Sequence, residues 1–204
     1  LRINCMSVII KNREQCLRHL IMGMDCFMDV LKPTFGPRGR HVMLKYDGEK
    51  AKITREGFEI ADSFKLENIY ENLGVSLLRG VCLSAHTAVG DGAVMAAIIA
   101  RDLVCSCERL VQAGFSIVEL RKGLKKGNEI LKKTLDNMAK QVKSRKQMEH
   151  LMMTASGGDT WMNDIIFQVQ KKMGPQGILS FNLTDGVEDE VIFREGMSFD
   201  ESLL

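Results

Sequence analysis

The sequence predicts a mainly α-helical protein with one small β-hairpin, an α+β fold overall. Long segments repeat apolar residues at intervals of three and four, which is the spacing of an amphipathic helix. One stretch instead carries two short β-type segments around Asp47-Gly48, a dipeptide typical of tight hairpin turns. After about residue 138 the helical patterns shorten and turn residues become frequent. The pattern therefore favours a helical domain followed by a smaller mixed segment.

Two amphipathic helices are expected before residue 90. The first spans about 12–32 and ends at Pro33, because proline disfavours helical geometry in the residue before it. The second spans about 66–88. Its apolar positions recur at helical spacing and lie on one face: Ile69, Leu73, Leu77, Leu78 and Val81.

Two more helices are expected between residues 92 and 138. The segment 92–112 is apolar on every side, which predicts a central, buried helix. Gly114 separates it from an amphipathic helix across Ile117 to Leu135. Within that helix the lysines of Arg121–Lys133 recur at helical spacing, which indicates a solvated face; a nucleic-acid-binding patch is the less favoured alternative.

Shorter elements are expected in the last third of the chain. Helices are predicted at 145–155 and 160–173, the second capped by Asp159 or Thr160. Glycine and proline then indicate a turn, and β-branched and aromatic residues indicate strands. This turn and the two strand candidates are Gly174–Gly177, Ile178–Phe181 and Glu190–Phe193.

Composition narrows the classes of function. The net charge of +2, with both signs interspersed, gives no reason to expect nucleic acid as a partner. No apolar run is long enough to cross a bilayer and no signal-peptide pattern opens the chain, so neither a membrane partner nor secretion is expected. The six cysteines lie among apolar residues without a CxxC pair, which favours reduced, buried thiols in an intracellular protein over disulfides or a zinc site.

Two glycine-bearing loops carry the main functional signal. Thr34–Arg40 lets the backbone turn sharply near a ligand, with basic residues directly behind it. Val89–Gly92 places Asp91 between two glycines, just before a predicted helix. Such a carboxylate suits a magnesium phosphate, because it binds the metal while N–H groups at the helix start face the phosphate. The structural alternatives are a helix cap for Asp91 and an ordinary helix-to-strand turn for the first loop.

These loops, with further segments in the same order, resemble the group I chaperonins of bacteria and mitochondria. Thr34–Arg40 resembles the family's threonine-hydrophobic-Gly-Pro-Lys-Gly-Arg loop, and Ile53–Gly57 resembles its Ile/Val-Thr-Lys-Asp-Gly turn. Glu195–Asp200 is similar to the family's Glu-Gly-Met-x-Phe-Asp. The other similar segments are Glu71–Gly74, Thr154–Asp159 and Val169–Ile178.

The resemblance implies a layout of three domains. Residues 1–138 would be the N-terminal part of the equatorial, ATP-binding domain, 139–190 the ascending part of a mixed intermediate domain, and 191–204 the start of the apical domain. It also implies partners: identical or related subunits in a ring, a co-chaperonin and unfolded client proteins. The family resides in the bacterial cytoplasm or the mitochondrial matrix, which are reducing compartments.

The resemblance further implies a site for ATP, Mg²⁺ and K⁺. Asp91 matches the family's magnesium ligand, and Glu56 stands where the family has an aspartate near the γ-phosphate, so it is the candidate catalytic carboxylate. The family's second catalytic aspartate and its adenine-side loop match nothing in this chain, so we expect no complete catalytic site from these residues. The candidate nucleotide-binding residues are Thr34, Phe35, Gly36, Pro37, Arg55, Asp91, Gly92, Ala93, Val94 and Met95.

One departure from the family weakens this site. Three threonines follow the family's Gly-Asp-Gly, whereas this chain has Ala93-Val94-Met95. A hydrogen bond to a charged group is worth roughly 1.5–3 kcal/mol, so losing two lowers affinity by about two to four decades. Two functions stay open: a chaperonin that assists folding with ATP from a degenerate site, and a non-hydrolysing paralogue or fragment that serves as an oligomer component or scaffold.

Overall fold

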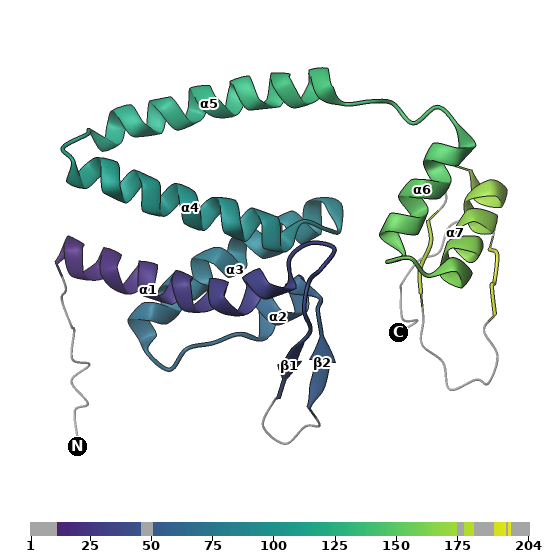
Figure 1. The fold of residues 1–204 in the computed structure, drawn as a ribbon, viewed down its shortest axis with the longest axis horizontal. Coiled ribbons are helices and arrows are strands. Elements are labelled where there is room, and N and C mark those ends of the chain that lie inside the picture. The colour runs from purple at the N-terminus through teal and green to yellow at the C-terminus, as the bar shows by residue number, and fades with distance from the viewer. Residues whose placement is uncertain (1–11, 46–50, 175–177, 182–189, 195, 197–204) are drawn as a thin grey trace, which may run out of the picture. The chain divides into compact units, whose positions relative to one another are not determined.

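The computed structural model describes residues 12–45, 51–174, 178–181, 190–194 and 196. Within them lie seven α-helices, one short 3-10 helix and a two-stranded hairpin (Figure 1). The chain divides into two units, residues 1–129 and 130–204. The mainly α-helical fold class with a small hairpin is therefore confirmed.

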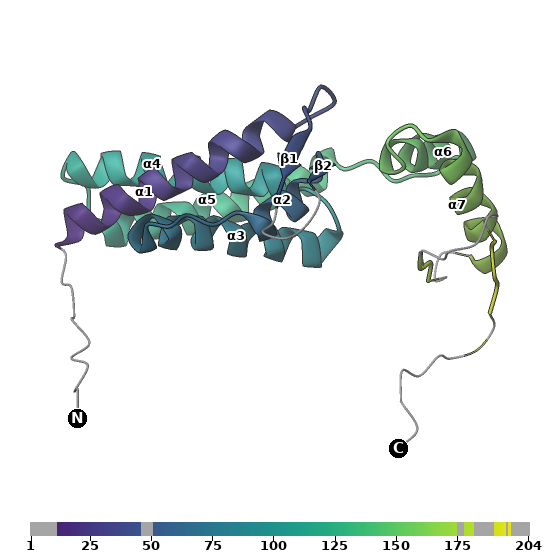
Figure 2. The same ribbon diagram turned by 90° about the horizontal axis from the view of Figure 1, so that it is seen from below.

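Helices α1 (Arg13–Leu31) and α3 (Ile69–Val89) form the central pair of the first unit. A capping box starts α1: Asn12 Oδ1 accepts from the backbone N–H of Gln15, and Gln15 Oε1 accepts from that of Asn12. Asn68 caps α3 by accepting from the N–H of Tyr70 at 3.1 Å. α1 runs obliquely across α3 and α4 (Figure 2).

Glycines let the backbones of α1 and α3 touch. A Cβ added to Gly23 of α1 would lie 1.8 Å from the backbone oxygen of Glu71 in α3. A Cβ added to Gly74 of α3 would lie 2.1 Å from the backbone oxygen of Leu20 in α1. Both neighbours are backbone atoms, so no larger residue fits at either glycine unless the helices move apart.

The hydrophobic core of the first unit surrounds this crossing. Phe27 of α1 packs on Phe64, with ring centroids 5.4 Å apart and the rings tilted, which is a favourable aromatic arrangement. Side chains from α1, α2, α3 and α4 complete the buried cluster. Its members are Met24, Phe27, Met28, Leu31, Ile60, Ala61, Val75, Leu78, Cys82, Ala93 and Ala97.

One short element links α1 to the hairpin, and another follows the hairpin. The 3-10 helix η1 (Lys32–Thr34) continues from α1. Strands β1 (Val42–Leu44) and β2 (Lys52–Thr54) pair antiparallel, so the predicted hairpin is confirmed, while its turn at residues 47–48 lies outside the described residues. α2 (Gly57–Ser63) follows β2, in a segment where the sequence predicted no secondary structure beyond the turn that ends at Gly57.

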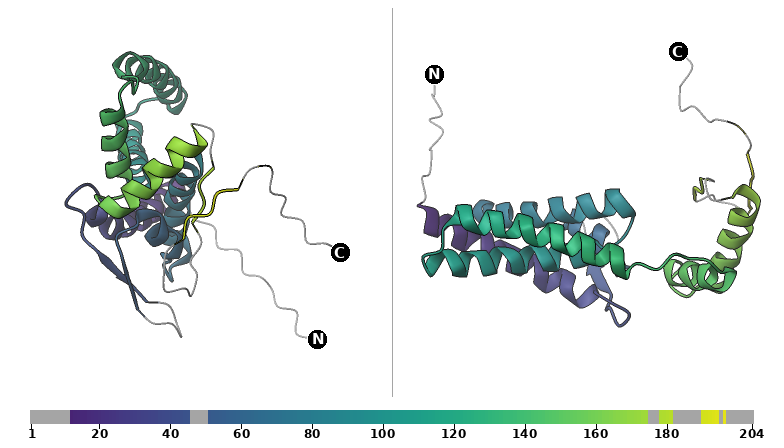
Figure 3. Two further views of the ribbon diagram at one scale, coloured as in Figure 1. Left: turned by 90° about the vertical axis from the view of Figure 1, so that its right-hand side faces the viewer. Right: turned by 90° about the horizontal axis from the view of Figure 1, so that it is seen from above.

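The prediction that residues 92–112 form a buried central helix is wrong. α4 (Ala93–Gln112) buries only Ala93 and Ala97. One of its faces packs on α1 and α3, whereas Ile99 and Leu103 on the rest of the helix are 53% and 46% exposed, because no described element covers them. α5 (Ile117–Met138) follows after a short turn (Figure 3). None of the residues of α5 is buried.

The predicted apolar face of α3 is buried only in part. Leu78 is buried and Val81 is half-buried. Ile69, Leu73 and Leu77 are exposed. α1 instead packs on the stripe marked by Gly74, because only that side of α3 allows the backbones to approach. The buried residues of α3 are Gly74, Val75, Leu78 and Cys82.

The expectation of buried thiols is likewise wrong for part of the chain. Cys16 and Cys26 lie on exposed positions of α1, and Cys105 and Cys107 of α4 are half-buried. Among the described cysteines only Cys82 is buried. An amphipathic helix has room for cysteine on its solvent side, so apolar neighbours in the sequence do not establish that a thiol is buried.

The second unit contains α6 (Arg145–Ala155) and α7 (Thr160–Met173), which pack against each other and have the predicted bounds. Asp159 caps α7 by accepting from the N–H of Met162 at 3.0 Å, as predicted. Gly174 ends α7, and the rest of the predicted turn lies outside the described residues. The two strand predictions at 178–181 and 190–193 are wrong: neither segment has the ladder of backbone hydrogen bonds that a strand requires.

Replacing Gly23 or Gly74 with alanine is expected to lower the free energy of unfolding by about 1–3 kcal/mol, because the new methyl group collides with backbone. Gly80→Ala on the same helix α3 is the matched control, since nothing lies within 4 Å of its added Cβ. Alanine favours a helix more than glycine does, so this variant should gain roughly 0.5–1 kcal/mol. Urea unfolding followed by circular dichroism measures all three; equal effects would contradict the close crossing.

The uncovered apolar residues of α3, α4 and α5 are expected to make the isolated chain self-associate. Leu77, Ile99 and Leu131 are each more than half exposed. Sedimentation velocity at rising concentration and binding of a hydrophobic dye measure this, and serine at Leu131 and Leu135 should lower both signals. A monodisperse monomer that binds no dye would show that these exposed apolar faces do not drive self-association.

Candidate functional site

Three segments that lie far apart in the sequence meet beyond the end of α1. A Cβ added to Gly57, the first residue of α2, would lie 2.1 Å from Cγ2 of Val94 and 4.0 Å from Oγ1 of Thr34. α4 also contacts both η1 and α2. The structure therefore brings two of the predicted site residues, Thr34 and Val94, to the start of α2.

The loop after η1 closes on itself through its backbone. Gly39 donates its N–H to the carbonyl oxygen of Gly36 at 2.9 Å, and Arg40 donates to that of Pro33 at 2.8 Å. Thr34 is buried, and its hydroxyl donates to the carbonyl oxygen of Leu31 at 2.7 Å. The predicted residues between them, Phe35, Gly36 and Pro37, form the exposed rim of the turn.

The exit of the hairpin is fixed by Thr54, a residue that sequence reasoning did not single out. Thr54 is buried, and its Oγ1 accepts from the N–H of Glu56 at 3.0 Å. Arg55 and Glu56 themselves are exposed. Glu56 is the N-cap of α2, but its carboxylate makes no capping hydrogen bond. Arg55 and Glu56 therefore lie at the surface of the site, on a backbone that the buried side chain of Thr54 fixes by its hydrogen bond.

Lys52 and Glu59 tie β2 to α2 through a hydrogen-bonded ion pair. Hydrogen bonds from Lys52 first and Thr54 second hold the pKa of Glu59 below its ordinary value. Helix α2 itself was missed in the sequence, although its buried residues Gly57, Ile60 and Ala61 have the three-and-four spacing of a helix. Glycine has a low helix propensity, so Gly57 at the first helical position did not indicate a helix.

Packing from α3 holds α2 in place. The ring of Phe58 stacks on His86, with centroids 4.0 Å apart and planes 8° from parallel. Arg79 Nε donates to the carbonyl oxygen of Ala61 at 3.1 Å, and the same guanidinium also bonds the carbonyl oxygen of Phe64. These bonds satisfy carbonyl groups that the end of a helix leaves without partners.

Asp91 stands between two left-handed glycines. Gly90, at φ +78°, ends α3, and Gly92, at φ +81°, is the N-cap of α4. The exposed carboxylate of Asp91 accepts from the N–H of Gly92 at 2.6 Å, so Asp91 is not the N-cap itself. No side chain caps α4. The first turn of α4 therefore presents its backbone N–H groups in the way that favours an anion.

The three residues after Gly92 point in different directions. Ala93 is 6% exposed within the core cluster, and the buried Cys82 thiol donates to its carbonyl oxygen at 3.5 Å. Burial raises the pKa of Cys82 to about 11, so the thiol stays a neutral donor. Val94 is half-buried against Gly57, and Met95 is 50% exposed. Of the three, Met95 is the side chain that the solvent reaches freely.

A metal at Asp91 would have few protein ligands. No group of three or more His, Cys, Asp or Glu side chains gathers in the part of the chain that the structure describes. Mg²⁺ is commonly held by one or two carboxylates, with phosphate and water as its other ligands. A single aspartate beside an uncapped helix start is therefore compatible with a magnesium phosphate but not with a metal bound by protein alone.

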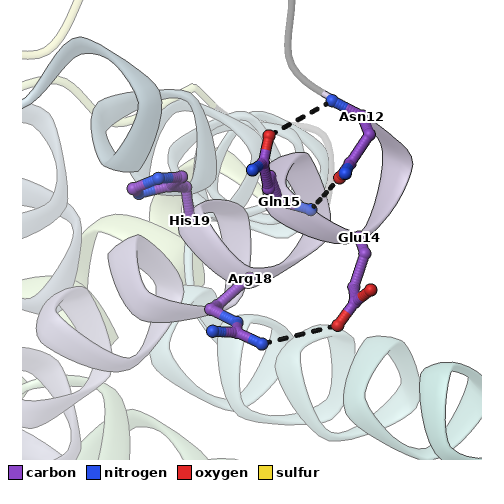
Figure 4. Close-up of a pocket in the computed structure, with 5 residues that line it drawn as sticks. All are labelled: Asn12, Glu14, Gln15, Arg18 and His19. Carbon is purple, nitrogen blue, oxygen red and sulfur yellow. Dashed lines mark hydrogen bonds and ion pairs between the residues drawn. The ribbon is translucent and has the colours of Figure 1, made fainter.

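A shallow pocket at the other end of α1 does not share this chemistry. It is lined by Asn12, Glu14, Gln15, Arg18 and His19 (Figure 4). Asn12 and Gln15 use their hydrogen bonds on the capping box, and Arg18 pairs with Glu14 along the helix. The polar groups of the pocket are thus largely committed to α1 itself.

Two further findings concern membrane-spanning helices and the similarity of the chain to known proteins. No helix of the described segments has both the length and the apolar character needed to cross a membrane. The sequence model of the TCP-1/cpn60 chaperonin family matches residues 27–179. That match includes the loop after η1, the hairpin, α2 and the start of α4, and it covers well over half of the chain. The chain therefore belongs to the TCP-1/cpn60 chaperonin family.

Proposed function

We propose that this chain is a chaperonin subunit that assists the folding of other proteins with ATP, as part of a ring oligomer, through a degenerate nucleotide site. The observation that carries the proposal is the meeting of η1, the start of α2 and the start of α4 at Thr34, Gly57 and Val94. Its partners would be related subunits, a co-chaperonin and unfolded clients.

The chemistry of the site suits a phosphate with its metal. The N–H groups at the start of α4 would face phosphate oxygens, Asp91 would bind Mg²⁺, and the exposed turn Phe35–Pro37 would contact phosphate and K⁺ through its backbone. Arg55 adds positive charge at the exit of the hairpin. When bound, Mg-ATP would supply the phosphoryl group, and Glu56, the candidate catalytic carboxylate, would act near its γ-phosphate.

A second function is favoured by the first turn of α4. Ala93, Val94 and Met95 offer no hydroxyl to a phosphate, so a non-hydrolysing chaperonin paralogue that serves as an oligomer component or scaffold is the alternative. The three positions are not equivalent, however. Threonine at Ala93 would add two heavy atoms to the core, and at Val94 it would face Gly57, so Met95 is the position where a hydroxyl is accessible.

Met95→Thr is expected to strengthen Mg-ATP binding by about ten- to a hundredfold, because one hydrogen bond to a charged group is worth roughly 1.5–3 kcal/mol. Calorimetry measures the affinity of the natural chain, of this variant and of one with threonine at Ala93, Val94 and Met95. The triple replacement should bind no better than Met95→Thr, because overpacking at Ala93 opposes the gain.

Asp91→Asn supplies the test of the metal ligand, with Asp136→Asn on the exposed surface of α5 as its matched control. The first should abolish the dependence of binding on Mg²⁺, and the second should leave it unchanged. Binding in the natural chain together with ATP turnover in the assembled protein would favour the ATP-dependent chaperonin. Binding that appears only with Met95→Thr would favour the non-hydrolysing paralogue.

A further inference from the structure

Val94 makes a close contact that the proposed chemistry does not require. Its Cγ2 occupies the space beside Gly57, 2.1 Å from where a Cβ of that residue would lie, and its own Cβ is 3.6 Å from the same point. Cβ atoms do not approach other atoms so closely, so Val94 in this position requires glycine at residue 57. Val94 also packs against the buried core cluster.

The contact joins segments that the chain itself connects only through α2 and α3. Thr34 reaches the same place, with its Oγ1 4.0 Å from the added Cβ, and the carbonyl of Leu31 fixes its hydroxyl. A valine in a helix strongly prefers one χ1 rotamer, so its methyl group does not swing away freely. The end of η1, the exit of the hairpin and the start of α4 thus meet at one place, where Val94 packs directly against Gly57.

We propose that Val94 is a positioning residue that keeps the loops of the candidate site assembled without a bound ligand. The proposal rests on the proposed function only for the identity of that ligand. A site held in this way does not have to order its loops when a ligand arrives. Ligand binding would therefore change the conformation of the hairpin exit very little in the natural chain.

A double-mutant cycle tests the contact directly. Gly57→Ala inserts a methyl group against Val94, and Val94→Ala removes the methyl group that it would meet. Each single change should raise the rate of tryptic cleavage after the exposed Arg55 about tenfold, whereas the double variant should stay within about threefold of the natural chain. Compensation of this size is typical of residues in direct contact.

Two controls separate this local effect from general loss of stability. Val75→Ala removes the same methyl groups from the core of α3, away from Gly57, and should raise cleavage after Arg55 and after Arg79 in α3 together. Gly57→Ala and Val94→Ala should raise cleavage after Arg55 preferentially. Val94→Thr keeps the shape of the side chain, so the ratio of cleavage after Arg55 to cleavage after Arg79 should stay as in the natural chain.

Saturating Mg-ATP gives the second readout. It should slow cleavage after Arg55 by a larger factor in Val94→Ala than in the natural chain, where the ligand covers Arg55 but has no loop to order. Additive effects in the cycle, or equal protection of both proteins by Mg-ATP, would overturn the proposal. If calorimetry finds no Mg-ATP binding in any variant, the proposed function fails, and the double-mutant cycle alone decides the role of Val94.

Discussion

The contact between the backbones of α1 and α3 at Gly23 and Gly74 is the constraint on which the rest of the first unit depends. Each glycine faces a carbonyl oxygen of the other helix, so the two axes have very little freedom to move apart or slide. The contact therefore constrains how the C-terminal ends of α1 and α3 lie relative to each other. Both ends lead into the candidate site, through η1 in one case and through Gly90 in the other.

α4 is attached to this pair by small residues and one ion pair. Ala93 and Ala97 are the only residues that α4 buries, and their small size allows it to lie close to its neighbours. Arg101 of α4 binds Asp25 of α1 at 2.6 Å and Asp102 at 3.0 Å. Because this cluster is partly exposed, it adds only modest stability. In the orientation that α4 adopts, Val94 lies against Gly57 and Met95 is exposed to solvent.

Periodic patterns in the sequence predicted the helices well, since local spacing determines where an amphipathic helix begins and ends. The bounds of α6 and α7 and the cap at Asp159 needed no tertiary information. The buried stripe of α3 could be located only with tertiary information, because its position depends on the contact between Gly74 and the backbone of α1. The same holds for the site: spacing indicated Asp91 and its glycines, whereas the contact between Gly57 and Val94 exists only after folding.

Two glycines at the site, Gly39 and Gly57, are required by packing, so their presence does not show whether the site binds a ligand. A Cβ at either position would lie 2.1 Å from Thr34 or Val94 whether or not a ligand binds. A chaperonin that had lost nucleotide binding would still need them to fold. Asp91 and Met95 have no such packing role, since both are exposed at the start of α4. Those two positions, and not the glycines, distinguish an ATP-dependent subunit from a scaffold built on the same loops.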